Sequence, residues 1–155
     1  MRISGIANDS IVDGPGVRTV IFTQGCRHRC PGCHNPETWS FDGGPEYSLP
    51  ELLAYLEKNC YTKKVTLSGG DPVYQEELPE LCRLLKERDY HIIVYTGFTW
   101  DQISDMDFLR YIDLLVDGPF VESLQTLDRP FVGSSNQRII DVRRSLSEGV
   151  PVLLP

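Results

Sequence analysis

Short apolar runs alternate along this chain with stripes of apolar residues at helical spacing. Residues 18–23 are mostly β-branched or aromatic, and comparable runs occupy residues 64–67, 91–95 and 113–116. Each run is soon followed by a glycine and other turn-forming residues, which is typical of a buried strand that ends in a loop. The pattern therefore predicts four strands.

One helix is predicted between each pair of successive strands. Ser48 and Glu51 form a capping box at the start of the first helix, which is expected to end near Asn59. The second helix covers residues 78–85 and the third residues 100–112. The apolar stripes are Leu49, Leu52, Leu53 and Leu56 in the first helix and Leu78, Leu81, Cys82 and Leu85 in the second.

This order of elements predicts an α/β fold with parallel strands and right-handed crossovers. A chain of 155 residues can form one domain but is shorter than the ~250 residues of a complete eight-unit barrel. We therefore expect a single domain, residues 1–155, built as a compact partial (β/α) barrel or a small open sheet. Ligands of such folds bind beyond the carboxyl ends of the strands, where residues 26–33, 68–71, 96–97 and 117–118 would meet.

Composition and charge narrow the possible functions. The chain is 41% hydrophobic and 24% charged, as ordinary globular proteins are. Its formal net charge of −7 would repel phosphate backbones, so general nucleic-acid binding is not expected. No run approaches the ~18 apolar residues of a membrane span, and the first residues hold no apolar signal core. We expect a cytoplasmic protein that binds no membrane.

Three cysteines form the most informative motif of the chain. Cys26, Cys30 and Cys33 have the spacing Cys-x3-Cys-x2-Cys, without a fourth cysteine nearby. Structural zinc sites use four protein ligands, whereas three ligands leave one coordination position open for chemistry. The spacing favours an iron–sulfur cluster. A zinc site that includes His28 or His34, and three unligated thiols, are the alternatives.

A glycine-rich turn, Ser-Gly-Gly-Asp-Pro at residues 68–72, follows the second predicted strand. Gly69 and Gly70 lack side chains, so their backbone groups can approach a polar ligand closely. The ammonium and carboxylate groups of an amino-acid moiety would suit such an exposed backbone edge. The alternative is a plain turn between a strand and a helix.

Together, the two motifs resemble those of the radical S-adenosylmethionine (SAM) superfamily. The resemblance implies a partial barrel of the radical-SAM type, in which Cys26, Cys30 and Cys33 ligate a 4Fe-4S cluster. It also implies that the amino and carboxylate groups of SAM chelate the fourth iron, beside Gly69 and Gly70.

Further motifs are similar to those of a narrower group. Residues 13–18 (Asp-Gly-Pro-Gly-Val-Arg) and 30–39 resemble activating enzymes of glycyl-radical proteins, and residues 95–99, 115–120 and 133–138 resemble activating proteins of anaerobic ribonucleoside-triphosphate reductases. The resemblance implies reductive cleavage of SAM and formation of a glycyl radical on the large reductase subunit. It also implies an electron donor such as flavodoxin or ferredoxin, and no catalytic side chain that acts as acid or base.

One position departs from the wider superfamily. The residue before the third cysteine is usually aromatic there, and in this chain it is Gly32. A glycine is expected at this position in the reductase-activating group. The resemblance therefore assigns the adenine contact to Gly32, Cys33 and His34, of which His34 can present a ring.

Three other functions stay open at this point. The chain could activate another glycyl-radical enzyme such as pyruvate formate-lyase, act as a radical enzyme on a small molecule such as a deazapurine precursor, or be a zinc-binding interaction module. The short length and residues 133–138 favour the reductase-activating group.

Several further residues have two possible roles. Cys60 and Cys82 are predicted to be buried thiols. Asp117 would either bind its own backbone in a turn, or hold a ribose hydroxyl or orient the partner. Arg18 and Arg138 would either offset the charge of the cofactor carboxylate or the thiolates, or pair with surface acids.

Overall fold

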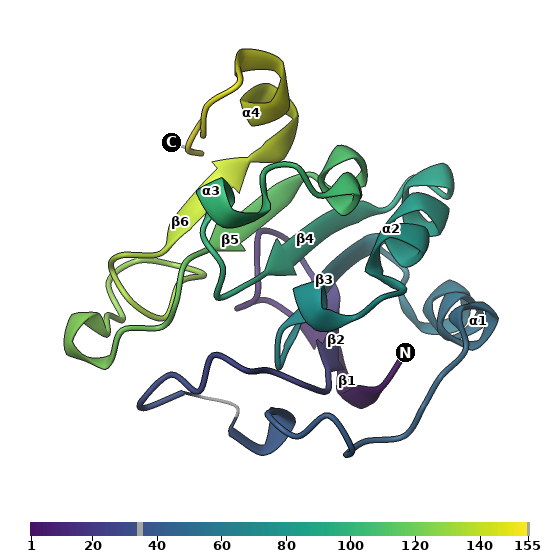
Figure 1. Cartoon of the computed structure of the whole chain (residues 1–155). Coiled ribbons are helices and arrows are strands. Elements are labelled where there is room, and N and C mark those ends of the chain that lie inside the picture. The colour runs from purple at the N-terminus through teal and green to yellow at the C-terminus, as the bar shows by residue number, and fades with distance from the viewer. Residues whose placement is uncertain (34–35, 155) are drawn as a thin grey trace.

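The computed structural model describes residues 1–33 and 36–154, and its centre is an open, mixed sheet (Figure 1). The strands lie in sequence order across the sheet, with β2 to β5 parallel and the outer pairs β1–β2 and β5–β6 antiparallel. The strands are β1 (Ile3–Ser10), β2 (Arg18–Thr23), β3 (Lys64–Gly69), β4 (His91–Tyr95), β5 (Leu114–Asp117) and β6 (Arg138–Asp141).

The four predicted strands are confirmed as β2 to β5, with bounds within two residues of those predicted. The expectation of parallel strands alone is wrong at both edges of the sheet. A parallel crossover needs a dozen or more residues, so the short connection between β1 and β2 forces these strands to be antiparallel. The connection from β5 to β6 holds only a single 3₁₀ turn, and β6 also returns antiparallel.

Most helices of the described residues lie in the connections between parallel strands, whereas the last 3₁₀ helix among them lies between β5 and β6 and the last α helix follows β6. No helix in this part of the chain is both long and apolar enough to cross a membrane. The α helices are α1 (Leu49–Asn59), α2 (Leu78–Glu87), α3 (Trp100–Ile103) and α4 (Val142–Glu148), and the 3₁₀ helices are η1 (Pro36–Thr38), η2 (Pro72–Tyr74), η3 (Asp107–Tyr111) and η4 (Glu122–Leu124).

The capping box of α1 is present, because the Ser48 hydroxyl accepts from Glu51 N and the Glu51 carboxylate accepts from Ser48 N. The prediction of one helix over residues 100–112 is wrong. The backbone is extended at Met106 (φ −74°, ψ 139°), and this break divides the segment into α3 and η3. Ser104 and Asp105 precede this break, and both residue types favour helix ends and turns over helix interiors.

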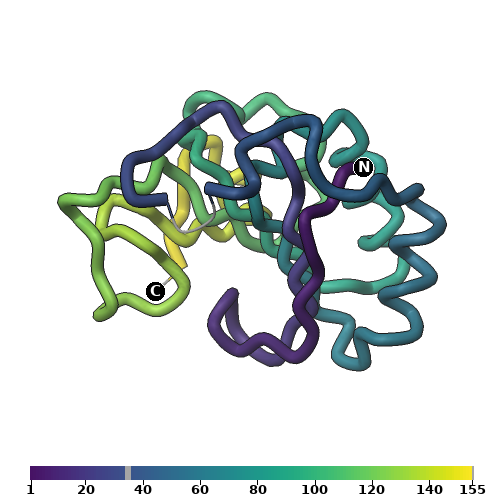
Figure 2. The backbone as a smooth tube through the Cα atoms, turned by 90° about the horizontal axis from the view of Figure 1, so that it is seen from below, coloured from purple at the N-terminus to yellow at the C-terminus, as the bar shows by residue number. Residues whose placement is uncertain are grey.

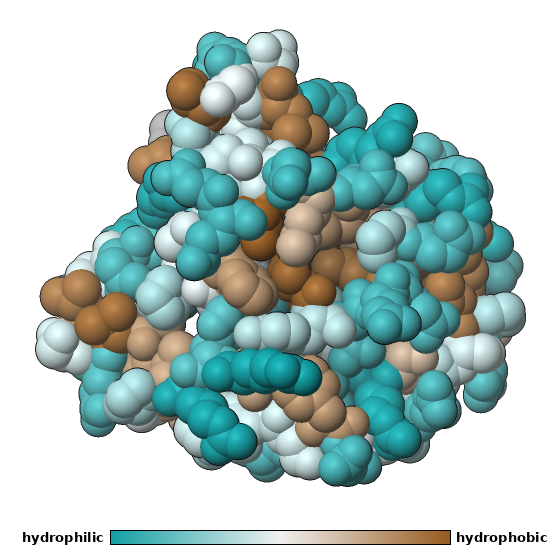
Figure 3. Space-filling view, in the orientation of Figure 1, coloured by the Kyte–Doolittle hydropathy of each residue, from teal (hydrophilic) through white to brown (hydrophobic). Residues whose placement is uncertain are grey.

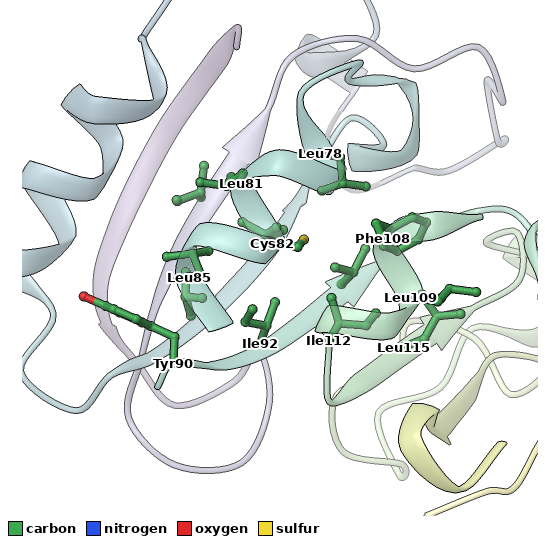
Figure 4. Close-up of a cluster of buried hydrophobic side chains, with 14 of the residues drawn as sticks. Leu78, Leu81, Cys82, Leu85, Tyr90, Ile92, Phe108, Leu109, Ile112 and Leu115 are labelled. Carbon is green, nitrogen blue, oxygen red and sulfur yellow. The ribbon is translucent and has the colours of Figure 1, made fainter. Parts of the chain in front are cut away.

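All four α helices pack on one face of the sheet, where the main core lies. Cys82 is completely buried there, and Cys60 is also buried, so both cysteines are confirmed as core thiols. Burial raises the pKa of Cys82 well above its usual range. Figure 4 shows α2 residues Leu78, Leu81, Cys82 and Leu85 packed with Ile92, Leu115, Phe108, Leu109 and Ile112 from β4, β5 and the segment around η3.

The opposite face of the sheet carries a buried arginine, Arg18, which is 1% exposed. Its guanidinium donates to Thr66 Oγ1 at 2.8 Å, to the Val65 carbonyl at 2.9 Å and to the Pro15 carbonyl at 3.0 Å. It also lies 2.9 Å from His91 Nδ1. Burial lowers the pKa of Arg18 to about 10. Arg18 therefore anchors the loop before β2 to β3 and β4, and neither expected role for this residue holds.

Replacing Arg18 by methionine is expected to lower the free energy of unfolding by about 3 kcal/mol, since buried carbonyls of Pro15 and Val65 would lose their donor. Urea unfolding of the apo-protein measures this. The matched control is Arg110→Met, because the Arg110 side chain is 65% exposed and pairs with a neighbouring surface acid. Equal losses in the two variants would contradict the anchoring role.

Candidate active site

The carboxyl ends of β2 to β5 border a cavity of about 300 Å³. The structure brings together there the four segments that the strand order places at one edge. Figures 1 and 2 both show the segment after β2 beside the segment after β5 at this edge. The cavity lining includes Cys26, Cys30 and Cys33, residues 68–70, Thr96 with Gly97, and Gly118.

The cysteine loop begins directly after β2. Gly25 adopts a positive φ of 117°, which turns the chain out of the strand, and the next residue is Cys26. Cys26 N donates to the Trp39 carbonyl at 3.1 Å, and Cys33 N donates to the Cys30 carbonyl at 3.1 Å. Cys26 is buried, whereas Cys30 and Cys33 are half-buried. The loop thus presents one sheltered and two accessible thiols to the cavity.

The environment of Cys26 disfavours its charged form. Burial, followed by the negative charge of Asp71, raises the pKa of the Cys26 thiol to about 11. A thiol must lose its proton to bind a metal, so the positive charge of the metal has to offset this cost. Cys26 is therefore suited to ligation rather than to acting as a free thiolate nucleophile.

Among the described residues, no three Cys, His, Asp or Glu side chains are gathered closely enough to hold one metal ion. A four-iron cluster has a different requirement, because each thiolate binds its own iron. His28, one of the two candidate zinc ligands, uses its Nε2 in a hydrogen bond with Asp71. His34, the other, lies outside the described residues.

The glycine-rich turn packs against the start of the cysteine loop. A Cβ on Gly69 would lie 2.4 Å from Thr23 N, and one on Gly70 would lie 2.5 Å from the Gly25 carbonyl oxygen, so no side chain fits at either position. Gly70 N donates to the Thr23 carbonyl at 2.8 Å, and Asp71 N donates to the Gly25 carbonyl at 2.9 Å. These N–H groups are therefore already used, which leaves carbonyl groups for contact with a ligand.

Asp71, the fourth residue of this turn, is completely buried. Its Oδ1 accepts from Val73 N at 3.0 Å, which starts η2. Its Oδ2 accepts from Thr96 Oγ1 and from Gly97 N, both at 2.9 Å, and lies 2.7 Å from His28 Nε2. Sequence reasoning did not single out Asp71, because nothing in a Gly-Asp-Pro turn distinguishes an exposed aspartate from this buried one.

Asp117, at the end of β5, has a structural role that neither expectation anticipated. It is buried, accepts from Trp100 N at 2.8 Å, and forms two hydrogen bonds with the Arg138 guanidinium at 3.0 and 2.6 Å. This contact raises the pKa of Arg138. The Gln137 side chain accepts from Gly133 N and donates to the Gly118 carbonyl. Residues 133–138 therefore brace the cavity wall against β5.

Of the three candidate adenine contacts, Gly32, Cys33 and His34, the structure places Cys33 at the cavity. Gly32 is exposed, does not line the cavity and adopts a positive φ of 73°. A Cβ there would lie 2.8 Å from Cδ of Glu122, so the cysteine loop passes close to η4. Cys33 lines the cavity, and His34 lies outside the described residues. The adenine assignment stays a prediction.

Sequence reasoning also did not assign a role to Trp39. Its indole Nε1 is buried and has no hydrogen-bond partner among the described residues, while the side chain lines the cavity beside Cys26. A buried donor without an acceptor is costly. A bound group with acceptor atoms, such as a cluster sulfur, would satisfy it, so the cavity fits an iron–sulfur cluster.

Comparison with known proteins agrees with this chemistry. Residues 12–140 match the model of a 4Fe-4S single cluster domain family. The chain is 37% identical over 136 residues to the anaerobic ribonucleoside-triphosphate reductase-activating protein of Enterobacteria phage T4. This match covers 83% of this chain and 86% of the phage protein. It is 39% identical over 122 residues to the pyruvate formate-lyase-activating enzyme of Clostridium pasteurianum, but spans only 50% of that enzyme.

The crystal structure of QueE from Escherichia coli has a similar fold, with a TM-score of 0.53 and 24% sequence identity. The match covers 63% of this chain and 52% of QueE, and it supports the α/β architecture alone. The match over nearly the full length of the phage protein is the more informative finding. The chain belongs to the 4Fe-4S single cluster domain family and to the family of anaerobic ribonucleoside-triphosphate reductase-activating proteins.

Proposed function

We propose that this protein activates an anaerobic ribonucleoside-triphosphate reductase by generating a glycyl radical on the large reductase subunit. The observation that carries the proposal is one cavity lined both by three cysteines and by the glycine-rich turn. The relationship to a reductase-activating protein over most of both chains supports the same function.

In this proposal Cys26, Cys30 and Cys33 hold a 4Fe-4S cluster and leave its fourth iron open for SAM. The carbonyl groups of Gly69 and Gly70 accept hydrogen bonds from the SAM ammonium, since the N–H groups of the turn are already used. When bound, the reduced cluster would give one electron to SAM and cleave it into methionine and a 5'-deoxyadenosyl radical. This radical would take a hydrogen atom from a reductase glycine.

The other residues of the cavity bind and shield rather than transfer protons. Phe120, Phe131 and Val132 contribute apolar surface that excludes water. We propose Gly32, Cys33 and His34 as the adenine contacts. No side chain acts as acid or base in this proposal, because the hydrogen that moves is taken by a carbon radical.

The segment between β5 and β6 offers a surface for the reductase. Leu127 is 96% exposed and Leu124 is also exposed, and both follow the cavity residue Phe120. Figure 3 shows apolar atoms gathered over this segment, at the left of the view. Exposed apolar patches often mark protein interaction sites. Contact here would bring a loop of the reductase to the mouth of the cavity.

The remaining expectations are part of the same proposal. Flavodoxin or ferredoxin is the electron donor, residues 1–155 form one domain, and the protein acts in the cytoplasm without nucleic acid or membrane. We also propose that the open sheet is a partial (β/α) barrel of the radical-SAM type. Its sequential strand order, with all α helices on one face, is that of a barrel segment rather than of a doubly wound sheet.

Activation of pyruvate formate-lyase is the less favoured alternative. The chain spans half of the matching pyruvate formate-lyase-activating enzyme, whereas it spans 86% of the phage reductase-activating protein. Offering each glycyl-radical protein in turn to the loaded enzyme would separate these two functions. The expected result is activation of the reductase alone.

The proposed function is tested by anaerobic reconstitution with iron and sulfide, reduction with dithionite and addition of SAM. We expect a 4Fe-4S cluster, and 5'-deoxyadenosine that forms faster when the large reductase subunit is present. Protein that takes up zinc but assembles no cluster would support an interaction module instead. Loaded, reducible protein that never cleaves SAM would contradict the proposal.

Trp39 offers a test of the fit between cavity and cluster. Its Nε1, which has no partner in the part of the chain that the structure describes, is expected to donate to a cluster sulfur. Such hydrogen bonds raise the reduction potential by stabilising the more negative state. Trp39→Phe should therefore lower the midpoint potential by about 40 mV, the one-electron equivalent of about 1 kcal/mol. Potentiometric titration followed by electron paramagnetic resonance (EPR) measures this, with Phe41→Leu as control. An unchanged potential in Trp39→Phe would contradict the assignment.

A further inference from the structure

A fully buried carboxylate links three segments of the candidate site. Asp71 belongs to the glycine-rich turn, and its Oδ2 is shared by Thr96 and Gly97 after β4 and by His28 in the cysteine loop. The proposed function uses the cysteines and the glycines, but it gives Asp71 no role. Burying a carboxylate costs free energy, which these hydrogen bonds only offset, so its presence needs an explanation.

The His28 ring is held from several sides. It lies edge-on to Phe98 with 4.6 Å between ring centroids, and 5.6 Å from the Tyr74 ring. A Cβ on Gly97 would lie 2.7 Å from His28 Cδ2, so the glycine makes room for the ring. The aromatic rings and the Asp71 carboxylate together fix the orientation of the imidazole ring.

The place of His28 in the chain makes this contact important for the cysteine loop. His28 stands two residues after Cys26 and two before Cys30, and its neighbours Arg27 and Arg29 are exposed. Arg29 also adopts a positive φ of 51°, a conformation that costs energy for a residue with a side chain. A loop with exposed, strained backbone needs an anchor to keep one geometry, and the His28–Asp71 contact provides one.

We propose that Asp71 is a positioning residue that, through His28, sets the cysteine loop at a fixed distance from the glycine-rich turn. This inference rests on the proposed function, because one amino-acid group of SAM must reach both the open iron and the carbonyl groups of Gly69 and Gly70. Loss of the contact leaves the ligands present but alters their distance from the turn. SAM binding is then affected more than cluster assembly.

Three substitutions separate this role from a general effect on folding. Asp71→Asn keeps the size but places an NH₂ group either against Val73 N or against the donors at Oδ2. His28→Leu fills the space between Phe98 and Tyr74 without a donor. His28→Gln restores an N–H at about the reach of the imidazole Nε2, so it should rescue the contact. The matched control for loss of one carboxylate is Asp105→Asn, an exposed residue outside the cavity.

The test measures iron and sulfide per chain, SAM affinity by equilibrium dialysis, and the change that SAM causes in the EPR spectrum of the reduced cluster. Asp71→Asn and His28→Leu should retain a cluster but bind SAM at least about tenfold more weakly, in the range of lost supporting hydrogen bonds at metal sites. Their EPR change should need correspondingly more SAM. His28→Gln should stay within about threefold of the wild type, and Asp105→Asn should be unchanged.

The outcomes distinguish this inference from the proposed function. SAM affinity and EPR change equal to those of the wild type in both Asp71→Asn and His28→Leu would overturn the positioning role. Loss of the cluster in step with loss of SAM binding would also overturn it, since the contact would then only support the loop. If Asp71→Asn does not fold, as judged by thermal unfolding, His28→Leu decides the question. A cluster-loaded wild type that binds no SAM would refute the proposed function instead.

Discussion

Replacing Cys33 by alanine is expected to leave a folded protein that forms no stable 4Fe-4S cluster and no 5'-deoxyadenosine above background. Cys33 is half-buried at the edge of the cavity, so its loss removes little packing. The two remaining thiolates cannot hold the three irons that three cysteines would ligate. Iron content, the EPR spectrum of the reduced protein and 5'-deoxyadenosine yield measure the effect.

The matched control for this variant is Cys60→Ala. Cys60 is a free thiol of the core, with its Sγ 3.4 Å from the Lys64 carbonyl and outside the cavity. This substitution should cost some stability and leave the cluster and SAM cleavage intact. A Cys33→Ala protein with a normal cluster would show that the ligand set has been assigned incorrectly.

Gly70→Ala is expected to reduce SAM affinity at least about tenfold and to destabilise the protein by about 2 kcal/mol. The added Cβ would lie 2.5 Å from the Gly25 carbonyl oxygen and 2.8 Å from that of Thr38. Both are backbone atoms, so relief requires the turn to move away from the cysteine loop. Equilibrium dialysis with SAM and thermal unfolding measure the two effects.

Gly5→Ala is the control for this substitution, because a Cβ on Gly5 would meet no atom of the described residues within 4 Å. It should leave SAM affinity unchanged. If Gly70→Ala bound SAM as tightly as the wild type, the turn would be only a connection between β3 and η2. That result would restore the simpler interpretation of the motif.

The elements predicted from sequence are those whose pattern is local. β2 to β5 are continuous apolar runs, and α1 and α2 carry leucines at helical spacing. β1 was missed because Gly5, Asn8 and Asp9 resemble a loop. Its strand conformation depends on pairing with β2, with register shifts near both ends and a positive φ of 57° at Asp9. Such pairing is a tertiary effect that local propensity does not encode.

The candidate site also has parts that the sequence predicts and parts that only the fold reveals. The three cysteines and the glycine-rich turn could be placed at one edge because parallel strands bring their carboxyl ends together. The contacts of Asp71 with His28 and of Asp117 with Arg138 join residues far apart in the sequence. Polar residues in turns are usually exposed, so only the fold reveals that these two carboxylates are buried.

The most direct test of the proposed activation uses a large reductase subunit labelled with α-deuterated glycine. Loaded protein, dithionite and SAM are added anaerobically, and the 5'-deoxyadenosine is analysed by mass spectrometry while the reductase is examined by EPR. We expect one deuterium in 5'-deoxyadenosine and a glycyl-radical signal on the reductase. Unlabelled 5'-deoxyadenosine with no radical on the reductase would contradict the proposed activation and place the substrate elsewhere.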